Sequence, residues 1–212
     1  MSSVVISGNT SGTITLDAPA IAGTTVLTLP AANGTVLTTA TGQTLTSPVI
    51  AGTPTGVGVL TSGTAVASTS GTSIDFTDIP SWVKRVTVMF NGVSTNGTSN
   101  ILVRLGNSGG IVTSGYVSQA ANQSSGTRST AGFIQTQEMT AVALLYGQFI
   151  CNLQSSSTNA WTGNGSMDKN DNVMPWCAGA LTSMASALTT VRITTVNGTD
   201  AFDAGSINIL FE

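Results

Sequence analysis

The chain has 212 residues, of which only 7% are charged, against about 25% in a typical soluble protein. It carries six scattered Lys and Arg residues, a formal net charge of −3 and no His. These values exclude a basic stripe for nucleic-acid phosphates, a Ser-His-Asp or Cys-His nucleophile system, and histidine as a metal ligand. No run reaches the roughly 20 apolar residues that span a bilayer, so we expect no membrane insertion.

Residues 1–60 differ from the rest, because they contain no aromatic residue and one charged residue, Asp17. Short β-like runs at 4–6, 14–16, 26–29 and 36–37 are separated by turn signals. Their side chains are too small to form a core alone, and identical copies are the simplest partners. We therefore predict an intertwined stem in a homo-oligomer, with a disordered linker as the alternative. The first twelve residues lack a basic region before an apolar run, so we expect no classical signal peptide.

Residues 61–71 are predicted to be a hinge or short bridging strand, and residues 72–212 a C-terminal domain. The stretch 72–106 contains three runs in which apolar and polar residues alternate, the period of a half-buried strand. The residues predicted to be buried are Ile74, Phe76, Val86, Val88, Phe90, Ile101, Val103 and Leu105. Asn91-Gly92 and Asn96-Gly97 are predicted to form tight turns between these strands. The stretch thus predicts the start of an antiparallel sheet.

Further strands are expected near 111–117, 131–137, 141–151, 158–163, 173–179, 187–196 and 204–211. Asn164-Gly165 and Asn197-Gly198 add two hairpin-type turns. Many short strands, frequent turns and no convincing helix predict an all-β fold, an antiparallel β-sandwich of jelly-roll type.

Four apolar residues are expected on outward-facing strand positions: Met89, Leu102, Leu145 and Leu210. Scattered surface hydrophobes are normal, but an outer face that packs against a neighbouring subunit also explains them. The predicted oligomeric stem favours the second interpretation.

Two motifs resemble bacteriophage fibre proteins. The first comprises GTITLDAP (12–19), AGTTVLTLP (22–30), GTV (34–36) and QTLTSP (43–48), and resembles repeats in the fibrous parts of tail fibres and other virion appendages. The second comprises FTDIPSWVKRVTVMFNGVS (76–94), ILVRLG (101–106) and INILFE (207–212), and resembles the C-terminal domain of tail-fibre or virion structural proteins. The resemblance implies a homotrimer in the virion, assembled in the bacterial cytoplasm. It also implies attachment to other virion proteins through the N-terminal segment, and a distal tip that binds host-surface glycan or protein. The family offers no fixed binding residues.

The sequence carries little catalytic or metal chemistry. It has no glycine-rich phosphate loop, and its few carboxylates do not form a recognisable pair, so we expect neither an enzyme nor a cofactor. Residues 167–172 (MDKNDN) could offer oxygen ligands to Ca²⁺, but they lack EF-hand spacing and include a lysine. A solvated turn is the simpler interpretation, and whether Asp168 and Asp171 bind a cation stays open. Cys151 and Cys177 are predicted to be buried free thiols, with a disulfide as the alternative.

The segments 107–130 and 154–172 lie outside the predicted strand framework and hold polar side chains suited to recognition. Trp161 is predicted to be an exposed aromatic that stacks on sugar, whereas Trp82 and Trp176 are expected to pack internally. The predicted contacts are Trp161, Tyr116, Asn122, Gln123, Arg128, Asn159 and Asn164. We therefore expect a non-enzymatic virion fibre that recognises a host receptor. A capsid decoration or head-fibre protein and a cellular lectin-like adhesin are the alternatives.

Overall fold

The computed structural model describes residues 3–7, 13–17 and 60–212, and the chain divides into two compact units, Met1–Thr53 and Pro54–Glu212. In the first unit, β1 (Ser3–Ser7) and β2 (Thr13–Asp17) form an antiparallel pair in which Ser3 lies opposite Asp17. The predicted runs at 26–29 and 36–37 lie outside the described residues. The prediction of an intertwined stem therefore stays a prediction.

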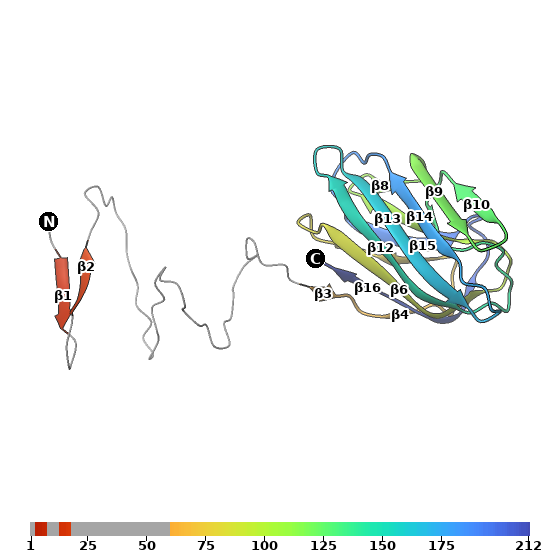
Figure 1. The fold of residues 1–212 in the computed structure, drawn as a ribbon, viewed down its shortest axis with the longest axis horizontal. Helices are drawn as coiled ribbons and strands as arrows, with labels where there is room; N and C mark the ends of the chain where they lie inside the picture. Colours follow the sequence, from red (N-terminus) through yellow and green to blue (C-terminus); the bar gives the residue numbers. More distant parts are fainter. Residues whose placement is uncertain (1–2, 8–12, 18–59) are drawn as a thin grey trace. The chain divides into compact units, whose positions relative to one another are not determined.

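The second unit is all-β and contains two antiparallel sheets, with no helix in residues 60–212 (Figure 1). The larger sheet has the strand order β10 (Gly126–Ser129), β9 (Tyr116–Ala121), β14 (Trp176–Leu181), β13 (Ala160–Lys169), β12 (Leu145–Ser155), β6 (Arg85–Thr95), β16 (Phe202–Phe211) and β3 (Thr61–Ser62), and β4 (Val66–Ala67) also pairs with β16. The smaller sheet has the order β11 (Phe133–Ile134), β7 (Ile101–Asn107), β15 (Thr190–Thr195) and β5 (Ser73–Phe76), and β8 (Gly110–Ile111) pairs with β7. The segment predicted to be a hinge thus contributes two short strands that pair with β16. Among the described residues, no helix is long and apolar enough to cross a membrane.

The hydrophobic core takes side chains from both sheets. All eight residues that the alternation of 72–106 predicted to be buried belong to it, so this prediction is confirmed. Phe133 of the smaller sheet lies between two aromatic rings of the larger one. Its centroid is 5.2 Å from that of Tyr116, edge-to-face, and 5.0 Å from that of Phe149. Aromatic pairs of this kind stabilise a fold beyond the burial of apolar area alone, and these two pairs pack the smaller sheet against the larger one.

The three predicted strands of 72–106 exist, but they do not belong to one sheet. β6 lies in the larger sheet, whereas β5 and β7 lie on either side of β15 in the smaller one. The turn at Asn96-Gly97 therefore carries the chain from one sheet to the other rather than closing a hairpin. The connection at Asn197-Gly198 does the same between β15 and β16, and Gly198 has the positive φ of 69° that such a turn uses.

Two predicted Asn-Gly turns are wrong, because both dipeptides lie inside long strands. Asn91-Gly92 is part of β6, at a place where the pairing with β12 and β16 shifts register. Gly92 has a φ of 66° there, as expected of a β-bulge. Asn164-Gly165 lies in the middle of β13 and pairs regularly with β12 and β14.

Two of the four apolar residues predicted to face outward are instead fully buried. Leu145 shares its parity with Phe149 and Cys151 on β12, and all three point into the core. Leu102 lies on a stretch of β7 that is buried on both faces. Met89 and Leu210 are partly exposed on the outer face of the larger sheet, where Met89 pairs with Asn208 and Leu210 with Thr87.

Candidate functional site

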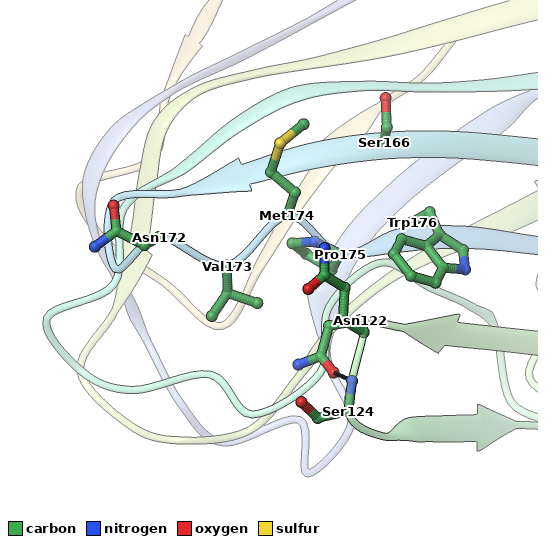
Figure 2. A pocket seen from close by; sticks show the side chains of 9 residues that line it. Asn122, Ser124, Ser166, Asn172, Val173, Met174, Pro175 and Trp176 are labelled. Carbon is green, nitrogen blue, oxygen red and sulfur yellow. Dashed lines mark hydrogen bonds between the residues drawn. The ribbon is translucent and has the colours of Figure 1, made fainter.

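A pocket of about 470 Å³ opens at one end of the larger sheet, between the β9–β10 turn and the β13–β14 connection (Figure 2). Ser166 of β13 and Trp176 of β14, which pair across adjacent strands, form its base. Its lining residues are Asn122, Gln123, Ser124, Ser166, Asn172, Val173, Met174, Pro175 and Trp176. It therefore combines one large aromatic ring with amide and hydroxyl groups, and none of these nine residues is charged.

Trp176 lies in the pocket because it begins β14 on the outer face of the sheet. It pairs with Ser166 on β13 and with Ala121 on β9. Successive side chains of a strand point to opposite faces, so the burial of Cys177 directs Trp176 outward. Cys177 is 3% exposed, whereas Trp176 is 50% exposed, so the prediction that Trp176 packs internally is wrong. A half-exposed indole offers a flat apolar face beside a polar edge.

The β9–β10 turn forms one wall and is built around Asn122. Its Oδ1 accepts hydrogen bonds from the backbone N–H of Ser124 at 2.8 Å and of Ser125 at 2.9 Å, and Figure 2 marks the first of them. The backbone N–H of Asn122 donates to the carbonyl of Ser125 at 3.0 Å. This Asx-type turn holds the side chain in place. Because the turn uses Oδ1, the side-chain NH₂ is the group that Asn122 offers to a ligand.

The β13–β14 connection forms the opposite wall. The backbone N–H of Lys169 donates to the carbonyl of Val173 at 3.0 Å, and that of Met167 donates to Pro175 at 2.9 Å. Asn172 closes this tight turn with a left-handed φ of 65°, which asparagine tolerates better than most residues. The turn presents Met174, whose side chain is 64% exposed, on the same wall as Val173.

The polar groups of the pocket are available to a ligand. In the part of the chain that the structure describes, the side chains of Gln123, Ser124, Ser166 and Asn172 make no hydrogen bond, and neither does the indole N–H of Trp176. Amides and hydroxyls can donate to and accept from sugar hydroxyls, while an aromatic face covers the apolar C–H side of a sugar ring. A mostly apolar pocket with a few such polar groups is the usual form of a small-ligand site.

The predicted contact residues do not gather in one place. Asn122 and Gln123 line the pocket, and Asn164 is exposed on β13, two residues before Ser166 on the same face. Arg128 is exposed on β10, opposite Gln119. Asn159 lies in the β12–β13 turn, at the other end of β13, where its Nδ2 donates to the carbonyl of Met184 at 3.4 Å.

Trp161 and Tyr116 are each 1% exposed, so the prediction that Trp161 is an exposed aromatic is wrong. Trp161 shares its parity on β13 with Met167, and both face the core. The hydroxyl of Tyr116 accepts from the backbone N–H of Leu105 at 2.8 Å and donates to the carbonyl of Val112 at 3.2 Å. Burial raises the pKa of Tyr116 to about 12. Both aromatic residues are part of the core.

The polar cluster at 167–172 contains a buried lysine. Lys169 is 2% exposed, and its ammonium donates to the carbonyl of Glu138 at 2.8 Å and to that of Gln137 at 3.4 Å. It also lies 3.1 Å from a carboxylate oxygen of Asp171. A cation of the chain itself thus sits where these oxygen atoms converge. No group of three or more His, Cys, Asp or Glu side chains within the described ranges could hold a metal ion.

No protein-family model, curated protein or solved structure matches this chain. The chemistry of the pocket is therefore the main guide to its role.

Proposed function

We propose that this chain is a non-enzymatic virion fibre protein whose C-terminal domain binds a neutral glycan of the host surface in the Trp176 pocket. In this proposal the fibre is a homotrimer, its N-terminal segment is a stem attached to the virion, and its tip has a jelly-roll-like topology. The observation that carries the proposal is the half-exposed indole of Trp176 beside the side chains of Gln123, Ser124, Ser166 and Asn172, which make no hydrogen bond within the described part of the chain.

The uncharged lining favours a neutral ligand over a charged one. An anionic sugar or a phosphate would need a cationic partner, and a cationic ligand a carboxylate; the nine lining residues supply neither. A sugar ring, in contrast, would stack on Trp176 and exchange hydrogen bonds with Asn122, Gln123 and Ser166. Asn164 and Arg128 stay predicted contacts, although neither lines the pocket.

A fibre would add to the weak affinity of a single shallow site. Polar contacts to a ligand that is otherwise solvated yield little net free energy each. Three copies on one stem raise the effective concentration at a host surface that displays many identical glycans. The phage-fibre resemblance of residues 12–48 and 76–106 supports this arrangement.

A Trp176→Ala substitution tests the site. We expect glycan-array binding of the full chain to weaken by about tenfold per site, the usual scale for removing an aromatic anchor. The melting temperature should stay within a degree or two, because the ring is half exposed. Val196→Ala is a matched control, since it truncates another 50% exposed side chain outside the pocket. If the Trp176 variant binds glycan as well as the wild type, Trp176 does not contact the ligand.

The place of the protein in the virion has its own test. Negative-stain imaging of virions carrying a labelled chain distinguishes a tail fibre from a head fibre or capsid decoration. A lectin-like adhesin of cellular origin would give no labelled virions.

A further inference from the structure

The segment 135–139 joins the two walls of the pocket through hydrogen bonds on each side. On the side of the β9–β10 turn, the hydroxyl of Ser125 donates to Oε1 of Glu138 at 3.1 Å. The same hydroxyl accepts a hydrogen bond from Nε2 of Gln137. Ser125 directly follows the lining residue Ser124, so this relay attaches the turn to the segment.

On the side of the β13–β14 connection, the joining group is the ammonium of Lys169. It donates to the carbonyl of Glu138 at 2.8 Å and pairs with Asp171 at 3.1 Å. Lys169 ends β13, and Asp171 in turn accepts from the backbone N–H of Val173, a lining residue, at 3.2 Å. Glu138 therefore contacts one wall through its side chain and the other through its main chain.

The backbone of Glu138 is strained. Its φ of 54° is in the left-handed region, which glycine adopts freely and glutamate rarely does. Such outliers persist only where surrounding contacts determine them, and they cluster at functional sites. In this conformation the carbonyl points at Lys169 while the carboxylate reaches Ser125.

We propose that Glu138 is a positioning residue of the Trp176 pocket, which holds the β9–β10 turn at its distance from the β13–β14 connection. Its effect on ligand affinity rests on the proposed glycan-binding function. The positioning itself can be measured without any ligand.

The first measurement is amide hydrogen exchange on the full chain. Glu138→Gly removes the carboxylate and relieves the strained φ, so we expect faster exchange in residues 122–126 and an unchanged or higher melting temperature. Glu138→Gln keeps an acceptor for Ser125 and should retain wild-type exchange. Ser125→Ala also removes the hydrogen bond from Gln137, so it should speed exchange at least as much as Glu138→Gly. The double variant should exchange no faster than Ser125→Ala, because Ser125→Ala already breaks the link that Glu138→Gly removes. Unchanged exchange in 122–126, or faster exchange spread over the whole sheet, would overturn the proposal.

The second measurement is affinity for a glycan that the wild-type chain selects on an array. We expect Glu138→Gly to raise the Kd about threefold, as for one exposed hydrogen bond, and Glu138→Gln to restore it. If exchange in 122–126 becomes faster but the affinity is unchanged, the hydrogen bond between Ser125 and Glu138 does not affect ligand binding in the Trp176 pocket. This result would overturn the positioning role of Glu138. A wild-type chain that binds no glycan would contradict the proposed function, while the exchange measurement would still decide the role of Glu138.

Discussion

Two thiols, Cys151 on β12 and Cys177 on β14, lie in the core and form no disulfide. The thiol of Cys177 donates to Oε1 of Gln135 at 3.3 Å. Burial raises the pKa of both thiols to about 12, against an ordinary value of 9.0. The prediction of buried free thiols is thus confirmed, and neither group is ionised or reactive at neutral pH.

These pKa values predict that the fold weakens in alkaline solution. Above pH 9 the unfolded chain loses the thiol protons, whereas the folded chain keeps them until about pH 12. The free energy of unfolding should therefore hold below pH 9 and then fall by about 1.4 kcal/mol per pH unit for each thiol. Urea unfolding at pH 7 to 11 measures this slope. The double variant Cys151→Ala/Cys177→Ala should decline less steeply, and an equal decline would assign the effect to other groups.

Single residues also show where the sequence was sufficient and where it was not. Alternation identified Val86, Val88 and Phe90 correctly, because a half-buried strand has a strict period of two. The same alternation, applied to residues 176 and 177, could have identified the exposed tryptophan of the pocket. If Cys177 is buried, its neighbour Trp176 must point outward, so both residues cannot pack in the core. Trp161 was misjudged because it follows a Ser- and Asn-rich stretch, whereas the pairing of β13 with β12 and β14 places it on the core-facing side of the sheet.

At the scale of elements, the existence of most strands was predictable, but strand length and partner were not. The segments 107–130 and 154–172, predicted to lie outside the strand framework, contain β9, β10 and β13. β6 and β12 have 11 residues each, and β13 has 10. Asn-Gly fits a hairpin turn, a bulge and a regular strand position alike, so the dipeptide alone could not reveal that Asn91 and Asn164 lie inside strands. Pairing between β6 and β16 joins residues far apart in the chain, and no local pattern encodes it.

The bulge on β6 brings two glycines together and gives a testable prediction. Gly205 on β16 has a φ of 86°, and a Cβ there would lie 2.3 Å from the carbonyl oxygen of Gly92. We expect Gly205→Ala to cost about 3 kcal/mol or more, because a left-handed backbone and a main-chain clash act together. Gly198→Ala is the matched control, since its φ is 69° and no atom lies within 4 Å of the added Cβ. It should cost about 1 kcal/mol in the same denaturant melt. If the two variants lose equal free energy of unfolding, β16 can move away from β6 and relieve the clash at little cost.

At the scale of the whole molecule, the two compact units predict separable assembly and folding. The hydrophobic core of the described residues lies within Pro54–Glu212, so we expect a fragment of residues 54–212 to be a folded monomer. The intact chain should be a trimer, because residues 4–50 lack the side chains for a core of their own. Light scattering combined with circular dichroism measures both species. A folded monomer of the intact chain at micromolar concentration would contradict the predicted trimeric stem. A trimer of the fragment would show that the contacts between subunits lie in residues 54–212.

The position of β6 between β12 and β16 has a consequence for synthesis in the cell. β6 ends at Thr95, but its second partner begins only at Phe202, about a hundred residues later. At a ribosomal rate of roughly 5–20 residues per second, the valine-rich β6 of a nascent chain waits several seconds with an open edge. Such an edge is a template for pairing with the nascent chains of neighbouring ribosomes. Residues 85–95 are therefore the segment that a holdase chaperone would need to shield.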